Sequence, residues 1–193
     1  MARPALIDHA ALIKTATLVA ARLGPAGMSI AAVSKAAGIP TGSIYHRLPS
    51  RDALLAEIWL SATERFQGIM LPQISTIASE ADAVECALST PRFARSDHAA
   101  AAVLSSHRRE EFIKPEAPEE YRTRAAKHAA EMRDAIAEAA TRLFPADSRG
   151  KEKLAVAVIG IPLGAVRVFL PQAVPPQEID QTIAAAVRAA LRV

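Results

Sequence analysis

The sequence predicts an all-α protein. Hydrophobic residues make up 51% of its 193 residues, alanine dominates among them, and only 8 residues are glycine. Alanine-rich sequence with apolar residues at helical spacing favours helices. No window alternates apolar and polar residues with the β-branched enrichment of a strand. A chain of this length can bury the core of one ordinary domain or of two small ones.

The first two helices are bounded by glycine and serine. A helix is expected over residues 7–23, where apolar residues repeat at helical spacing, and the Gly-Pro-Ala-Gly sequence at 24–27 ends it. Ser29 is a candidate N-cap for a second helix through Ala37. Gly38 supplies the left-handed residue that ends this second helix.

A third, short and polar helix is expected over residues 41–48, ending at Pro49. Ile44 and Leu48 lie four residues apart and would form its buried stripe. Ser50 then caps a fourth helix. Two short helices joined by a tight turn, with a polar second helix, are typical of a helix-turn-helix that enters the major groove of DNA.

The remaining chain is also predicted to be helical. The fourth helix should continue to about Met70 and close at Pro72. Prolines are expected to separate further helices near 75–89, 91–112, 116–144, 149–170 and 176–192.

Positive charge is concentrated in the segment that holds the helix-turn-helix. The formal net charge of the chain is +3. Through Leu55 there are six basic and two acidic residues, a balance of +4, whereas the remaining 17 basic and 18 acidic residues give −1. This distribution is the one that a module facing DNA phosphates needs.

Candidate DNA-binding residues lie on and beside the third helix. Short polar side chains there can reach base edges, while Arg47 and Arg51 are suited to charge-assisted hydrogen bonds with phosphate. Gly42 would permit close approach to the DNA. The full set is Lys35, Thr41, Gly42, Ser43, Tyr45, His46, Arg47 and Arg51.

The stretch from Ile13 to Leu54 resembles the N-terminal domain of the tetracycline-repressor (TetR) family of bacterial transcriptional regulators. From residue 33 it reads VSKAAGIPTGSIYHRLPSRDAL. The positions that match the family pattern by identity are Gly38, Gly42, Tyr45, Ser50 and Leu54, and those that match in kind are Ile39, Ser43, Ile44 and Arg51. Pro40, Arg47 and Leu48 replace the usual Ser, His and Phe. These departures make the operator sequence unpredictable by analogy.

The resemblance implies a helix-turn-helix DNA-binding domain at residues 1–49 and a helical ligand-binding and dimerisation domain at 50–193. It places a ligand pocket among the middle helices, lined by apolar groups with a few polar anchors. The large or titratable candidates are Trp59, Phe66, Met70, Phe93, His98, His107, Tyr121, His128 and Met132. The alternative is that the aromatic residues and Met70 are core residues and that each histidine lies at the surface or is hydrogen-bonded.

The last two helices are apolar on most sides and are therefore expected to be buried on most sides. In the family, the last two long helices form a four-helix bundle with the partner subunit. The candidate interface residues are Val156, Ile159, Gly160, Leu163, Val166, Ile179, Ile183 and Val187. The competing interpretation is that these residues form the core of a monomer.

These observations favour a homodimeric, ligand-responsive transcriptional regulator of the bacterial cytoplasm, with a repressor expected. Its partners would be a double-stranded DNA operator, a small-molecule effector and a second copy of itself, without a membrane. Two alternatives remain: the same fold as an activator or without a ligand, and an all-α enzyme or binding protein whose N-terminal helices are scaffold.

No H-E-x-x-H, G-x-S-x-G or P-loop motif occurs in the sequence. The one cysteine, Cys86, excludes an internal disulfide framework and zinc-ligand spacing, and it fits a reducing compartment. We therefore expect no catalytic residue, no cofactor and no metal, and we read a redox-sensing role for Cys86 as the weaker interpretation. No secretory signal opens the chain.

Overall fold

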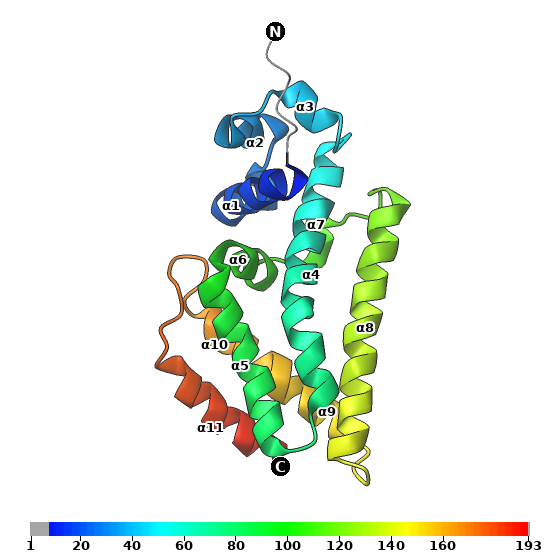
Figure 1. Cartoon of the computed structure of the whole chain (residues 1–193), viewed down its shortest axis with the longest axis vertical. Helices are drawn as coiled ribbons and strands as arrows, with labels where there is room; N and C mark the ends of the chain where they lie inside the picture. The colour runs from blue at the N-terminus through cyan, green and yellow to red at the C-terminus, as the bar shows by residue number, and fades with distance from the viewer. Residues whose placement is uncertain (1–7, 193) are drawn as a thin grey trace.

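The computed structural model describes residues 8–192, and within that range it contains helices and no strands (Figure 1). The predicted all-α class is confirmed. The predicted first residue of the first helix, at position 7, lies outside the described residues. The elements are α1 (His9–Gly27), α2 (Ile30–Ala37), α3 (Thr41–Tyr45), α4 (Arg51–Thr76), α5 (Glu80–Ser96), α6 (His98–Ser106), α7 (Arg109–Phe112), α8 (Glu119–Leu143), α9 (Gly150–Ala155), η1 (Val156–Gly160), α10 (Ile161–Arg167) and α11 (Ile179–Leu191).

Helices α1 to α3 form what we call the head, and within it α2 begins and ends where the local signals predict. The Ser29 hydroxyl accepts a hydrogen bond from the backbone N–H of Ala32 at 3.1 Å, which caps α2. Gly38 ends α2 in the left-handed conformation, with φ 67°. Helix α3 is shorter than expected, although Leu48 N still donates to Ile44 O at 2.9 Å and continues the turn.

A sharp kink interrupts α1 near its end. Gly24 has φ 65° and ψ 169°, a conformation that is essentially restricted to glycine. The chain then makes one more turn through Pro25 before α2 begins. The predicted end at the Gly-Pro-Ala-Gly sequence therefore corresponds to a kink rather than to an open loop.

Two prolines predicted to end helices lie inside helices instead. Helix α4 continues through Pro72 to Thr76, and α5 continues through Pro91 to Ser96. Proline removes one backbone hydrogen bond, but packing on neighbouring helices can outweigh that loss. Pro91 is buried and α5 packs against α4, α10 and α11.

The break expected at Pro91 falls instead at Asp97. The Asp97 carboxylate accepts from the backbone N–H of Ala100 at 3.3 Å and from Arg65 Nη1 at 2.5 Å. It therefore caps α6 and ties the α5–α6 junction to α4.

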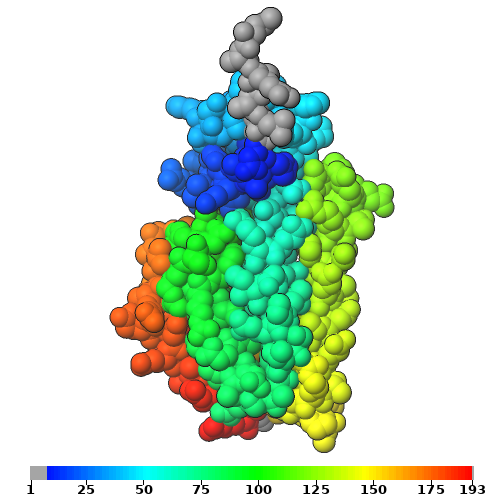
Figure 2. All heavy atoms as spheres, in the orientation of Figure 1, coloured from blue at the N-terminus to red at the C-terminus, as the bar shows by residue number. Residues whose placement is uncertain are grey.

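Helices α4 to α11, which we call the body, form a long bundle below the head (Figure 1). Helix α4 runs the length of the body beside α8 and packs against α1, α5, α6 and α7 as well. Figure 2 shows α1 seated directly above α5 and α6, and α1 packs on α6. The head core is continuous with the body, because Val103, Phe112 and Tyr121 belong to the same buried cluster as Leu12 and Ile44.

Within residues 8–192 no helix is long and apolar enough to cross a membrane.

Cys86 is fully buried in the cluster of residues from α4, α5, α8, α9, η1 and α11 that we call the lower core. Burial raises the pKa of its thiol to about 12. A buried thiol with such a pKa is unreactive, because the nucleophile is the thiolate. The redox-sensing interpretation of Cys86 is therefore not supported.

Candidate nucleic-acid interface

Helix α3 divides into a buried and an exposed face. Ile44 is 0% exposed and Leu48 just after the helix is 1% exposed, as their spacing predicts. Tyr45 is 50% exposed, and Thr41 and His46 are also exposed. Helix α3 lies at the opposite end of the molecule from α9 (Figure 1). The polar side chains of this short helix are therefore free to meet an external partner.

Gly42 lies on the exposed side of α3. A Cβ atom built at this position would meet no atom within 4 Å, so the head itself does not require glycine here. Lys35 on α2 is exposed as well, whereas Ser43 and Arg47 are partly buried.

Arg51 has a different contact from the phosphate contact expected from the sequence. Its Nε donates to Met28 O at 2.7 Å, and its Nη2 donates to the carbonyls of Pro25 and, at 3.4 Å, of Ala26. The guanidinium, at the first residue of α4, thus binds the carbonyls that the end of α1 leaves free. Arg51 fixes the head on α4, because it holds the turn that leads into α2.

Replacing Arg51 by alanine should destabilise the head by about 1–2 kcal/mol, since several hydrogen bonds from a charged donor are lost. Arg51→Lys should not restore stability, because a single ammonium group lacks the fork that reaches these carbonyls. Amide hydrogen exchange over residues 25–30 and urea unfolding measure the effect. Wild-type protection in Arg51→Lys would contradict the role as a backbone clamp.

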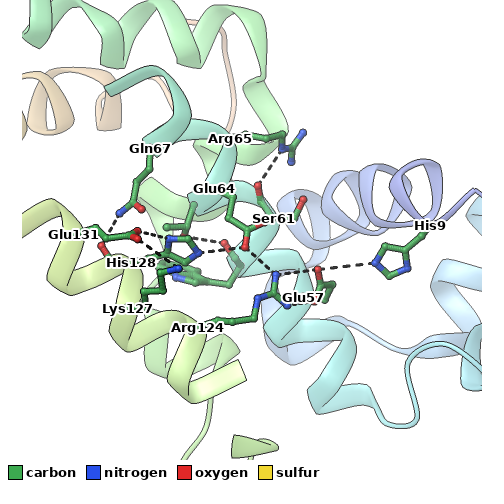
Figure 3. A network of polar contacts seen from close by, with 12 residues as sticks. His9, Glu57, Ser61, Glu64, Arg65, Gln67, Arg124, Lys127, His128 and Glu131 are labelled. Atoms are coloured by element: carbon green, nitrogen blue, oxygen red, sulfur yellow. Dashed lines mark hydrogen bonds and ion pairs between the residues drawn. The ribbon is translucent and has the colours of Figure 1, made fainter. Parts of the chain in front are cut away.

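Polar side chains connect the head with α4 and α8 (Figure 3). His9 Nε2 on α1 lies 3.9 Å from Glu57 Oε1 on α4. Arg124 on α8 bridges two carboxylates of α4, with Nη1 2.8 Å from Glu57 Oε2 and Nη2 2.8 Å from Glu64 Oε1. These polar contacts link α1 of the head to α4 and, through Arg124, to α8.

The same network continues down α8. His128 Nε2 lies 3.2 Å from Glu64 Oε1, and His128 Nδ1 lies 3.2 Å from Glu131 Oε2. Gln67 Nε2 donates to the carbonyl of His128 at 2.9 Å. The imidazole is thus held between two carboxylates from different helices (Figure 3).

The pKa of Glu64 lies below its ordinary value of 4.5. Burial raises it, but hydrogen bonds and charge from Arg124 and His128 lower it by more. A carboxyl with a lowered folded-state pKa contributes stability that is present above the unfolded value and is lost as the pH falls through the folded value. In urea unfolding, Glu64→Gln should therefore be less stable than wild type at neutral pH. This difference should shrink as the pH falls below 4.5 and through the lowered folded-state value. A difference that stays constant across this range would contradict the assignment.

A small cavity of about 40 Å³ lies between α4, α5, α6 and α10. Phe66 and Phe93 both line it, with ring centroids 5.3 Å apart. Sequence reasoning missed most of its lining, because the lining residues come from four different helices and no local pattern marks them. The other lining residues are Thr90, Ala94, Ala101, Leu104, Ser105, Leu163 and Val166.

The other aromatic and methionine candidates for the ligand pocket lie outside this cavity. Trp59 packs against Phe112 in the core shared with the head, with ring centroids 5.4 Å apart. Met70 is fully buried in the lower core, and Met132 packs against that core. Tyr121 is buried in the core that the head shares with the body.

The candidate histidines also lie elsewhere, each with its own partner. His98 Nε2 lies 3.1 Å from Ala173 O. His107 packs edge-on against Phe112, and His128 lies in the α4–α8 network. The alternative interpretation of hydrogen-bonded histidines therefore describes these positions.

The candidate dimer residues divide by exposure. Val156 is 54% exposed and Gly160 is exposed, while Ile159, Leu163 and Ile179 are partly buried. By contrast, the side chains of Val166, Ile183 and Val187 are 0%, 1% and 0% exposed. These last three do not fit the expected intersubunit contact, because η1, α10 and α11 pack on α5 and bury them within the monomer.

Comparison with known proteins supports the resemblance seen in the sequence. Residues 12–58 match the family model described as bacterial regulatory proteins, tetR family. No curated protein sequence matches this chain.

Solved structures share the fold over nearly the whole chain. The transcriptional regulator FadR from Bacillus subtilis, solved with stearoyl-CoA, has a TM-score of 0.70 at 14% identity and covers 95% of this chain and 99% of its own. AibR, solved with isovaleryl coenzyme A and operator DNA, has a TM-score of 0.68 at 17% identity over 94% and 96% of the two chains. The TetR-family regulator PfmR from Thermus thermophilus has a TM-score of 0.69 at 15% identity over 96% and 98%.

Proposed function

We propose that this chain, whose residues 12–58 match the TetR family model, acts as a homodimeric repressor that binds a palindromic operator and is released by a small molecule. In this proposal residues 1–49 bind DNA and residues 50–193 bind the effector and pair two subunits. The observation that carries it is the exposed polar face of α3 above its buried Ile44 and Leu48. Two such helices would enter successive major grooves about 34–36 Å apart.

The face of η1 and α10 that includes Val156, Ile159, Gly160 and Leu163 supports pairing of two subunits. Val156 is an exposed large apolar residue, and a Cβ built at Gly160 would meet no atom within 4 Å. Apolar surface beside glycine allows a second helix to approach closely and be buried. Val156→Glu should shift the protein from dimer to monomer in sedimentation, because it places a charge on this apolar face. Lys151→Glu, at an exposed lysine of α9, should leave the dimer intact.

The cavity beside α6 supports an effector site, because α6 both lines the cavity and packs on α1 of the head. AibR and FadR, the neighbours solved with acyl-CoA molecules, are consistent with an apolar or amphipathic effector. A coupling free energy of roughly 1–3 kcal/mol between cavity and operator would suffice for regulation.

The test is fluorescence anisotropy with DNA from upstream of the chain's own gene, measured at several salt concentrations. Lys35→Ala should weaken binding to all sequences alike and lower the salt slope by about 1. His46→Ala should change the sequence preference by about 1–3 kcal/mol at one base pair. Lys151→Ala, an exposed lysine on α9 at the far end of the body, is the matched control and should bind as wild type.

Absent or salt-insensitive binding would contradict a DNA-binding role. Operator binding that tightens when a ligand occupies the cavity would contradict release by the effector. Unchanged operator affinity with every ligand that enters the cavity would remove the effector from the proposal.

A further inference from the structure

We propose that the groove between α4 and α8 is a second ligand site and that it binds an organic ammonium ion. The charged group of this ion lies beside Glu64 and Glu131, and its apolar part lies over Leu71 and Pro72. The groove shares no lining residue with the cavity beside α6, so this site is separate from the proposed effector site. Three observations carry the inference: the space in the groove, the unmatched charge along it, and a buried oxygen atom without a hydrogen bond.

The groove has room for a small organic ion, since its volume is about 310 Å³. A Cβ atom built at the exposed Gly68 would meet no atom within 4 Å, so the space beside this glycine is open. Leu71 and Pro72 add apolar surface one turn further along α4. The polar residues of the lining are Glu64, Gln67, His128 and Glu131. The groove therefore brings apolar surface and carboxylates together.

Positive charge does not balance negative charge along the groove. Its lining holds two carboxylates and no lysine or arginine. Arg124 pairs with both Glu57 and Glu64 at 2.8 Å, and Lys127 Nζ lies 3.8 Å from Glu131 Oε1. Three carboxylates thus share two permanently charged cations. One negative charge remains unmatched unless a further cation is present.

His128 supplies that further cation only when it is protonated. Its Nε2 lies 3.2 Å from Glu64 Oε1 and its Nδ1 lies 3.2 Å from Glu131 Oε2 (Figure 3). An imidazolium donates from both nitrogens, whereas a neutral imidazole has one N–H and can donate to one carboxylate only. Histidine exchanges this proton between about pH 5 and 8. An ammonium ion in the groove replaces the missing positive charge when the ring is neutral.

Gln67 adds an acceptor that lacks a donor. Its side chain lines the groove and is 7% exposed, and its Nε2 donates to the carbonyl of His128. Among the described residues its Oε1 accepts no hydrogen bond. A buried acceptor without a partner is unfavourable. An ammonium group has a positive charge and three N–H donors, so it offers both things that this lining lacks.

The experiment is isothermal titration of the full chain, without DNA, at about pH 8 with butylammonium, 1-butanol and butanoate. Wild type should bind butylammonium more tightly than 1-butanol and should not bind butanoate, which the carboxylates repel. Glu131→Gln should weaken butylammonium binding by about fivefold and leave 1-butanol unchanged, since one partly exposed charge pair is lost. Glu138→Gln, which removes an exposed carboxylate further along α8, is the matched control and should bind as wild type.

A second variant tests the position of the ligand. Gly68→Leu fills the groove from α4, so it should abolish binding of butylammonium and of 1-butanol alike. Leucine favours a helix more than glycine does, and the open space accepts its side chain, so this variant should stay folded. Urea unfolding checks that its stability is not below that of wild type.

The pH dependence tests the role of His128. At about pH 5.5 the imidazolium repels a second cation, so wild type should bind butylammonium about fivefold more weakly than at about pH 8. His128→Gln carries no such proton and should bind about equally at both. The charged and titratable groups that surround His128 or its partners are Glu57 and Glu64 of α4, Arg124, Lys127 and Glu131 of α8, and His9 of α1.

Equal affinities for butylammonium and 1-butanol would overturn selection of the ion by the carboxylates. Unchanged binding in Gly68→Leu would overturn the groove as the site. Equal affinities of wild type at the two pH values would contradict competition with the His128 proton. No binding of butylammonium at about pH 8 would overturn the whole inference and leave the proposed function standing, because operator binding and the cavity beside α6 do not depend on this groove.

Discussion

Replacing Phe112 by alanine should destabilise the protein by about 3–5 kcal/mol, because a large buried ring is lost and leaves a cavity. Phe112 is 0% exposed. Its ring centroid lies 5.4 Å from that of Trp59 on α4 and 5.7 Å from that of His107, which follows α6. The ring therefore joins α4 to the α6–α7 connection, at the level where the head core continues into the body.

Urea unfolding followed by circular dichroism measures this loss. Val168→Ala is the control, since Val168 is 79% exposed and its truncation should change the free energy of unfolding by less than about 0.5 kcal/mol. A loss below about 1 kcal/mol for Phe112→Ala would show that this ring does not support the shared core.

Gly24→Ala should destabilise the protein by about 1–3 kcal/mol, because only glycine adopts its φ of 65° and ψ of 169° without strain. The added Cβ would also lie 3.4 Å from His107 Cε1, in ordinary van der Waals contact. The cost therefore comes from the backbone and not from a clash. It should appear as a lower free energy of unfolding in urea.

Gly68→Ala is the matched control with the opposite sign. Gly68 is an exposed residue inside α4, and a Cβ there would meet no atom within 4 Å. Alanine should stabilise this helix by about 0.5–1 kcal/mol relative to glycine. Two Gly→Ala changes with effects of the same sign would contradict the conformational argument.

The helix-turn-helix could be predicted because its signals are local. Ser29 and Gly38 cap α2 through contacts within a few residues, and the spacing of Ile44 and Leu48 defines a buried stripe without knowledge of the rest. The same local reasoning failed at the exposed Pro72 and at the buried Pro91, where α4 and α5 continue because both helices pack on their neighbours.

The site residues beyond α3 depend on tertiary structure. Arg51 has the charge of a phosphate contact, and its partners became visible only when α1 and α4 were placed side by side. The cavity is formed by small and apolar residues from four helices, of which the sequence pointed to Phe66 and Phe93 alone as pocket candidates. The apolar character of its helix on most sides predicts Val166 at an interface, yet Val166 is buried and its helix packs on α5 of the same chain.

Helix α4 is long enough to connect the head directly with the far end of the body. It is one unbroken helix of 26 residues, about 39 Å in length, that starts at the Arg51 clamp and ends where Arg142 binds the carbonyls of Ile74 and Ser75. A tilt of about 5° around that lower anchor would carry its upper end by about 3 Å. In the proposed dimer, a small displacement deep in the bundle would therefore be enlarged at the head, on the scale that decides whether two heads match one helical repeat of a duplex.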